Sequence, residues 1–177
     1  MTIAQELQKP ATSPYIEMYE IDGRNFHSSL FFHFTPSADA AFVFDSFTWT
    51  PFPIVMTGVE ATSEQPNRPK LRISNITKII QPYLQQYQNL VNVRVTRRRT
   101  LEKYLADGSE PNNTQQLPKE VYYIKTLTTH TRDFIEFELT TVFDLPGVKL
   151  PRAQALKDQT GGHSMYAPGL STIRFRG

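Results

Sequence analysis

Two stretches indicate the fold: Arg68-Pro69-Lys70-Leu71-Arg72-Ile73-Ser74-Asn75 and, beyond a helix-like segment, Val91-Asn92-Val93-Arg94-Val95-Thr96-Arg97-Arg98-Arg99. The first alternates apolar and polar residues and ends in Ser-Asn, which is typical of a short strand that enters a turn. The second alternates valine with polar residues and then becomes rich in arginine. Neither stretch has the residues of a catalytic site.

Further runs on both sides of these stretches have the composition of strands. The clearest is 134–143, where Ile135, Phe137 and Leu139 share one face and glutamates occupy the other. The expected strands are 15–22, 26–34, 42–50, 54–60, 90–105, 121–128 and 134–143. This content predicts a mainly β fold, as a barrel or sandwich that carries a helix.

One helix is expected within 76–88, where apolar residues recur at helical spacing. Pro82 lies inside this pattern and is expected to kink the helix or to divide it in two. A second short helix is expected at 2–8, so the prediction is a β-barrel-like domain with one or two short helices.

The chain is expected to hold a β-rich domain over 1–152 and an irregular carboxy-terminal extension over 153–177. Residues 109–118 have the composition of a loop with little apolar anchoring. We expect this loop to be a mobile tip, ordered only by a neighbour.

Composition limits the classes of function. The net charge of the 177 residues is only +2, whereas a general nucleic-acid binder usually carries a larger excess or a concentrated basic face. The absence of cysteine excludes disulfides, thiolate metal sites and cysteine nucleophiles. No signal peptide is expected, and no stretch approaches the roughly 20 apolar residues that span a bilayer. We therefore expect a soluble chain made in a cytoplasm, with no cofactor and no membrane partner.

Groups suited to catalysis are few. The histidines lack ligand spacing, and His27 and His33 are expected on one strand face about 20 Å apart, too far for one metal. Glu136 and Glu138 are expected roughly 7 Å apart on one strand face, which overlaps the spacing of glycosidase carboxylates. A solvated strand face explains the same pattern. No nucleophile elbow or phosphate-binding glycine loop occurs, so we do not expect an enzyme.

The arginine-rich strand is the one unusual feature. Arg97 and Arg99 continue the phase of the valines, while Arg94 and Arg98 lie on the opposite face. The far end of this strand must project beyond the core or meet carboxylates from another chain. Three interpretations stay open: a solvated edge strand protected by charge, a subunit interface, and a nucleic-acid contact.

Six stretches, taken in order, resemble the amino-terminal domain of the phage minor tail protein L family over roughly 2–152. They are Tyr15-Ile16-Glu17-Met18-Tyr19-Glu20-Ile21-Asp22, Phe47-Thr48-Trp49-Thr50-Pro51-Phe52-Pro53-Ile54, Arg68 to Asn75, Val95 to Arg99 with Asp107, 134–145, and Pro151-Arg152. The last stretch lacks the glycine of the family's closing Pro-Gly-Arg.

The resemblance implies a structural virion protein of the tail tip. Such a protein is a trimeric β-barrel hub between a distal tail protein ring and the central tail-tip protein, and its lumen lets DNA pass during ejection. The implied partners are copies of the chain and these two proteins, with DNA only as passing cargo. Members of the lambda type continue into a cysteine-bearing iron–sulfur domain. This sequence ends at Gly177 without a cysteine, so neither that cluster nor that domain is expected.

Within this interpretation, the candidate subunit interface is Arg94, Arg97, Arg98 and Arg99. We expect Arg97 and Arg99 to contact a copy of the chain or a tail neighbour. The alternative function is a small nucleic-acid-binding β-barrel that uses the arginine strand with stacking tyrosines. Those tyrosines would be Tyr83, Tyr87 and Tyr104. A small hydrolase based on Glu136 and Glu138 is a third possibility.

Overall fold

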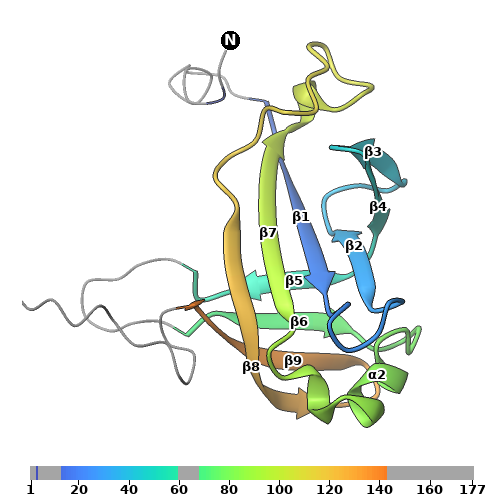
Figure 1. Cartoon of the computed structure of the whole chain (residues 1–177). Helices are drawn as coiled ribbons and strands as arrows, with labels where there is room; N and C mark the ends of the chain where they lie inside the picture. Colours follow the sequence, from blue (N-terminus) through green and yellow to red (C-terminus); the bar gives the residue numbers. More distant parts are fainter. Residues whose placement is uncertain (1–2, 4–12, 60–67, 143–177) are drawn as a thin grey trace, which may run out of the picture.

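The computed structural model describes residue 3, residues 13–59 and residues 68–142, which form a mainly β fold (Figure 1). In this part of the chain the strands form one sheet in the order β3-β4-β2-β1-β7-β8-β9-β6-β5. The strands are β1 (Tyr15–Asp22), β2 (Phe31–Thr35), β3 (Phe42–Phe44), β4 (Phe47–Pro51), β5 (Ile54–Thr57), β6 (Lys70–Ser74), β7 (Arg94–Leu101), β8 (Glu120–His130) and β9 (Phe134–Thr140). The helical elements are α2 (Gln81–Gln86), η1 (Gln88–Leu90) and η2 (Glu102–Tyr104).

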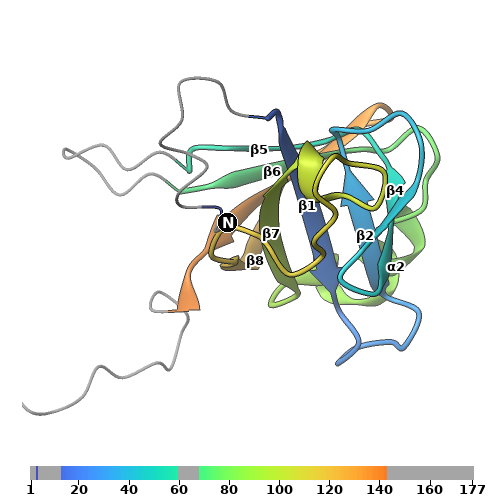
Figure 2. The ribbon, with the colours of Figure 1, turned by 90° about the horizontal axis from the view of Figure 1, so that it is seen from above.

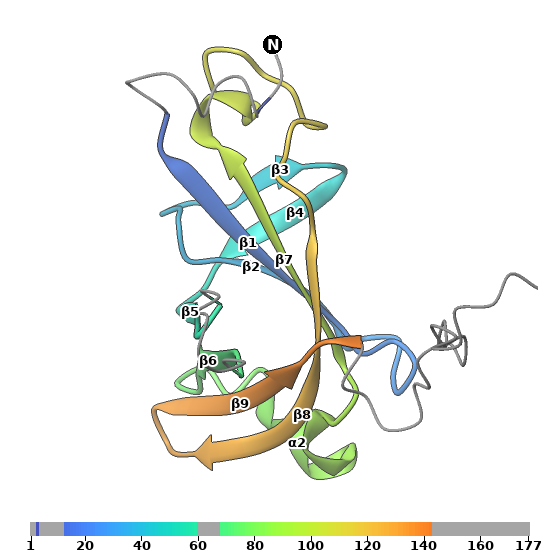
Figure 3. The same cartoon turned by 90° about the vertical axis from the view of Figure 1, so that its left-hand side faces the viewer.

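The sheet bends sharply between its two halves. Figure 2, viewed from above, shows β5 and β6 running across β1 and β7, and Figure 3 shows the same change of direction from the side. Strand β8 belongs to both halves because it pairs with β7 and with β9. Its pairing with β9 shifts register between Ile124 and Thr126 and again between Leu127 and Thr129. Such irregularities bend a strand and increase its twist, which accounts for the turn of the sheet.

A mainly β, barrel-like domain was expected. The mainly β content is confirmed, and strand pairing in the described residues gives one open sheet with β3 and β5 at its edges. The backbone at Phe52-Pro53 joins β4, the neighbour of the edge strand β3, to the other edge strand, β5. The amide of Phe52 donates to the carbonyl of Thr35 at 2.9 Å, and the amide of Ser74 donates to the carbonyl of Pro53 at 2.9 Å. Proline has no amide proton, so the ladder is interrupted at this link.

Strand β1 lies between two apolar clusters. Tyr19 faces the main core, which draws on both halves of the sheet. Ile16 and Met18 face a smaller cluster with Phe44 and Trp49. Because apolar side chains cover both faces of β1, they also shield nearby side chains of the paired strand β7 from water. This shielding sets the environment of the arginines on β7.

The run 42–50 was expected to be one strand and is a hairpin of β3 and β4. Phe44 pairs with Phe47, and the two intervening residues, Asp45 and Ser46, have φ of 51° and 66°. Two central residues with positive φ give the turn whose twist matches a pair of strands. The sequence hides this turn because neither residue is glycine.

The run 26–34 was also expected to be a strand, but only β2, from Phe31, is extended. Before it the chain closes a turn: the Gly23 amide donates to the Leu30 carbonyl at 2.8 Å, and the Leu30 amide donates to the His27 carbonyl at 2.9 Å. The expectation that His27 and His33 share one strand is therefore wrong.

The helix expected within 76–88 is present as α2, but it starts after Ile80. Pro82 lies in its first turn, where the missing amide proton has no intrahelical partner to lose, so the expected kink does not occur. The single turn η1 follows.

Three predictions concern the ends of the chain and a loop. The helix at 2–8, apart from Ile3, and the extension at 153–177 lie outside the described residues, so the boundary at 152 stays a prediction. The loop 109–118 is tied to β7, because the Leu117 amide donates to the Arg99 carbonyl at 2.8 Å and the Thr100 hydroxyl to the Gln115 carbonyl at 2.6 Å. These anchors come from the same chain, and the mobility of the loop stays a prediction.

Candidate functional site

The arginines of β7 form cross-strand ion pairs with β1 and β8. Antiparallel pairing sets Arg97 opposite Tyr19 and Arg99 opposite Glu17. Arg97 binds Glu17 and also Glu120, the latter at 3.3 Å, and Arg99 binds Glu120. Arg97 is largely buried, so these pairs are only partly open to solvent. Alternating guanidinium and carboxylate groups thus cross three strands on this face.

Two tyrosine hydroxyls complete this face. Tyr19 donates to Glu17 at 2.8 Å, and Tyr122 donates to Glu120 at 3.3 Å. Burial, and then the adjacent Glu17 carboxylate, raise the pKa of Tyr19. Burial and Glu120 likewise raise the pKa of Tyr122. Both hydroxyls therefore stay protonated as donors, and neither is suited to act as a base at neutral pH.

The opposite face of β7 holds a buried cation. Arg98 is 1% exposed, and its guanidinium lies 5.5 Å from the ring centre of Trp49 and 5.9 Å from that of Phe44. It binds Asp45, and its Nε donates to Gln116 Oε1 at 2.9 Å. Its charge is therefore balanced by one carboxylate and by two aromatic faces, as a buried cation requires.

The ion pairs of the β7 arginines form a first charge ladder. Arg94 ends it near the β1–β2 turn, on the same face of β7 as Arg98. It donates to Asp22 at 2.6 Å and approaches Glu20 at 3.5 Å. The neighbouring His33, and then Arg94, lower the pKa of Glu20 although burial opposes the shift. Arg24, ahead of Arg94, lowers the pKa of Asp22. Both carboxylates are thus ionised at neutral pH.

All four predicted site residues therefore meet carboxylates of their own chain. The sequence had suggested carboxylates from a second chain, and this reason for an interface no longer applies. The subunit interface itself stays a prediction. Arg94 and Arg99 are its more accessible members, whereas Arg98 is enclosed.

Sequence reasoning missed the partners of these arginines. Glu20 and Asp22 share one face of a predicted strand and Glu17 lies on the other, so carboxylates on both faces were a usable signal for a neighbouring basic strand. Asp45 and Glu120 gave no such signal, because only the β3–β4 turn and the β7–β8 register bring them to the arginines.

The two glutamates of β9 form a second ladder on the solvent face. Glu136 accepts from Arg72 at 2.8 Å and from Lys70 at 3.3 Å. Glu138 accepts from cations on both sides, Arg68 at 2.9 Å and Lys125 at 3.1 Å. These partners, led by Arg72 and by Lys125 respectively, lower the pKa of both carboxyls. A general acid for glycoside hydrolysis needs a raised pKa, so the pair lacks the chemistry of that site.

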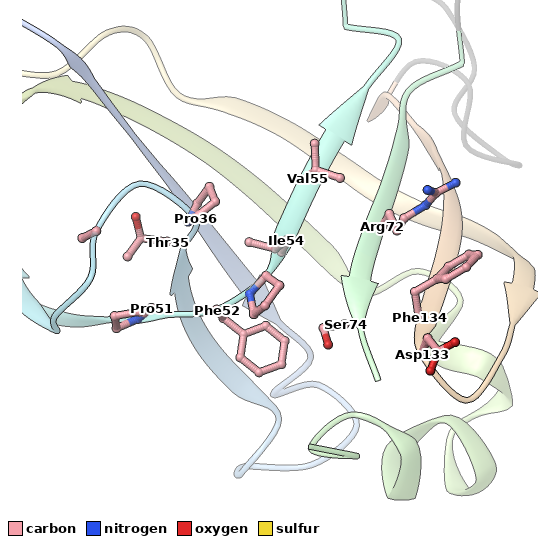
Figure 4. A pocket seen from close by; sticks show the side chains of 12 residues that line it. Thr35, Pro36, Pro51, Phe52, Ile54, Val55, Arg72, Ser74, Asp133 and Phe134 are labelled. Atoms are coloured by element: carbon pink, nitrogen blue, oxygen red, sulfur yellow. The ribbon is translucent and has the colours of Figure 1, made fainter. Parts of the chain in front are cut away.

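An apolar groove lies at the link between β4 and β5. It has a volume of about 600 Å³, and Figure 4 shows Pro51, Phe52 and Ile54 on one side with Arg72 and Phe134 on the other. Arg72 lies over the Phe134 ring at 4.5 Å and is already bound to Glu136. No cluster that could hold a metal ion occurs among the described residues. In the same part of the chain no helix is long and apolar enough to cross a membrane.

The arginines of β7 and the glutamates of β9 are thus paired within the chain itself. The family model described as phage minor tail protein L matches residues 24–167 of this chain. The chain belongs to that family, and it is therefore a structural protein of the phage tail and a component of the virion that interacts with other tail proteins.

Proposed function

We propose that this protein forms part of the hub at the tail tip. In this role it joins the distal tail protein ring to the central tail-tip protein, assembles as a homotrimer and lines the channel for DNA ejection. The family match over 24–167 carries the proposal, because it covers β2 to β9, with the arginines of β7 and the ion pairs of β6 and β9.

The internal ion pairs support a templating role rather than chemistry. A ring component must present a fixed surface to the next component, and preorganised surfaces lose little conformational entropy on assembly. Arg97, Glu17 and Glu120 lock three strands together, and Arg98 fixes the β3–β4 turn to β7. The outer surface can then be recognised as a rigid body.

Free nucleic-acid binding receives less support. The arginines of β7 are neutralised by Glu17, Glu20, Asp22, Asp45 and Glu120. Of the tyrosines expected to stack on bases, Tyr104 is buried, and the other two pack against neighbouring rings.

The proposal is tested by removing the gene from the phage and supplying it in trans with a peptide tag. Without the protein, we expect tails that lack a completed tip under the electron microscope. With tagged protein, gold-labelled antibody should bind only at the end distal to the head. Complete tips without the protein, or label along the tube, would overturn the proposal.

The arginine interface is part of the same proposal and needs its own variant. Arg94→Ala with Arg99→Ala removes the more accessible cations and leaves the buried Arg98 in place. We expect tail assembly to fall at least tenfold, because losing a partner of a desolvated charge pair costs about 2–5 kcal/mol. Normal assembly by a folded double variant would remove these residues from the interface.

A further inference from the structure

The solvent side of β6, β8 and β9 exposes its cations and covers its carboxylates. Four cations on this side have side chains that are 44–67% exposed, whereas the two carboxylates are only 12% and 17% exposed. We define the basic face by these four cations and the two carboxylates between them, which are Arg68, Lys70, Arg72, Lys125, Glu136 and Glu138. A molecule that approaches the basic face therefore meets positive charge first.

The ion pairs of the basic face do not use up its positive charge. Glu136 serves both Lys70 and Arg72, and Glu138 likewise serves two cations, so four cations against two carboxylates leave a net charge of +2. Arg72 uses its Nε and Nη2 for Glu136, at 3.2 and 2.8 Å. A guanidinium has five N–H donors, so Arg72 can bind a second acceptor without releasing the first. The basic face thus retains binding capacity for carboxylates from outside the chain.

The basic face adjoins the apolar groove at Arg72. This residue lines the groove, and its guanidinium lies over the Phe134 ring at 4.5 Å. Val55 is paired with Arg72 across β5 and β6, so its side chain points to the same side of the sheet, where it is 47% exposed. Figure 4 shows Arg72 between Val55 and Phe134, with Asp133 beyond the ring. An apolar surface and a basic surface therefore meet at one arginine.

This combination fits a protein better than a nucleic acid. The centres of protein interfaces are enriched in aromatic residues and arginine, whereas specific nucleic-acid interfaces are more polar and much more positive. The groove is lined by apolar side chains such as Pro51, Phe52 and Ile54, which offer nothing to a phosphate backbone. The two glutamates of the basic face would also repel phosphates.

Charge indicates the kind of protein. In a symmetric contact, a second copy of this chain would bring the same four cations against the first four, and such like-charge contacts are unfavourable. A partner that carries carboxylates has the opposite charge and completes the pairs that Glu136 and Glu138 share between two cations each. The partner is therefore a different, acidic protein surface.

We propose that the basic face and the apolar groove together bind an acidic segment of another tail protein. That segment places an apolar side chain in the groove and carboxylates against Lys70 and Arg72. Burial in the groove supplies affinity, and the charges select the partner and its orientation. The inference uses membership of the tail protein family but not the hub position, and it concerns a different surface from the arginines of β7.

Photocrosslinking in purified tails identifies the occupant. The chain has no cysteine, so Val55→Cys can be labelled at one position with a benzophenone maleimide. The labelled protein is added to a phage extract that lacks the wild-type protein, and completed tails are purified before irradiation. Mass spectrometry should find a crosslink to another tail protein, within a segment that contains Asp or Glu. Val43→Cys, labelled in the same way on the exposed side of β3, should not capture that segment.

Several results of this experiment would overturn the proposal. They are a crosslink from Val55→Cys only to copies of this chain, only to DNA, or only to a segment without carboxylates, and completed tails that give no crosslink. If the label at Val55→Cys prevents assembly, the following charge variants decide.

Charge reversal gives the second measurement. Lys70→Glu with Arg72→Glu should lower the yield of assembled tails by at least roughly tenfold, because it turns attraction of the partner into repulsion. Lys78→Glu with Lys119→Glu makes the same change of charge at exposed lysines outside the basic face and should leave the yield unchanged. Circular dichroism and thermal melting verify the fold of each variant.

A neutral variant covers the case in which charge reversal unfolds the protein. Lys70→Gln with Arg72→Gln removes the two cations without placing carboxylates beside Glu136, and we expect a smaller loss of tails, at least about threefold. Normal yield from a folded variant of Lys70 and Arg72, or an equal loss in the lysine control, would refute the contact. Tip labelling is independent of these results: a crosslink to an acidic segment of a tube protein would support this contact while contradicting the hub position.

Discussion

The β1–β7 and β6–β9 strand pairs both carry arginines opposite carboxylates, but they use them differently. On β7, Arg98 is enclosed and Arg97 largely buried. On β6, Lys70 and Arg72 stay more than half exposed while they bind Glu136. The same residue types therefore form a buried brace in one pair and a solvated surface in the other. Residue type and spacing alone do not fix what an ion pair contributes.

The difference follows from what covers each strand. β1 has apolar clusters on both faces, and each face of the paired strand β7 lies beside one of these clusters. β6 and β9 bury one face, with Leu71, Ile73 and Phe137 pointing inward, and leave the other to water. Buried ion pairs are costly to break because the remaining charge is left unpaired, whereas exposed pairs are replaced by water.

The largest effect is expected from Arg98→Ala. The change removes a buried guanidinium from Asp45 and from the two aromatic rings and leaves a cavity beside Trp49. We expect a loss of about 3 kcal/mol in the free energy of unfolding, measured by urea denaturation. Arg98→Met should recover part of that loss because it refills the space. A loss below about 1 kcal/mol for Arg98→Ala would contradict the buried brace.

A double-mutant cycle on Arg97 and Glu17 sharpens the same contrast. Arg97→Met, Glu17→Gln and the double variant should give a coupling energy of about 1–3 kcal/mol, as expected for a charged hydrogen bond with little solvent access. Tyr19→Phe provides a control for the hydroxyl that also binds Glu17. Additive single effects would show that this pair behaves like a surface contact.

The two charge ladders should contribute differently to the pH dependence of stability. Glu20 and Asp22 have pKa values lowered by folding, so their contribution is complete above the ordinary carboxyl pKa of about 4 and is lost as the pH falls through the folded-state value. We expect Glu20→Gln to flatten the acid limb of the stability curve, followed by urea denaturation. Glu136→Gln should flatten it less, since the cations that lower its pKa, Arg72 and Lys70, are more than half exposed. The reverse order would be evidence against the comparison.

The smallest effect is expected at the surface ladder. The cycle Arg72→Ala with Glu136→Gln should give a coupling energy below about 1 kcal/mol, and added salt should reduce it further. The matched measurement on Arg97 and Glu17 should change little with salt. Strong, salt-resistant coupling at Arg72 would mean that this face is also shielded from water.

The local pattern predicted much of this fold. The alternation of apolar and polar residues predicted β1 with its observed bounds. It predicted β8 and β9 with small differences at their ends. The isoleucine spacing placed α2, although Pro82 moved its start. The residue pattern could not predict whether the barrel-like sheet closes, because closure depends on where Pro51 and Pro53 interrupt the pairing of distant strands.

The candidate site was predictable only as a set of arginines. Which of the arginines share a face of β7 followed from the two-residue period of a strand, and this period is a local property of the chain. Their partners were not predictable, because Arg98 and Asp45 are 53 residues apart and meet through a turn formed by two non-glycine residues with positive φ.

The sequence by itself determined a mainly β protein, its strongest strands, the absence of thiol chemistry and a family resemblance. Only the tertiary structure decided which arginines are buried and which carboxylates neutralise them. The physical reason is range. Strand and helix patterns arise from neighbours a few residues apart, whereas solvent access and charge pairing depend on strands brought together across the whole sheet.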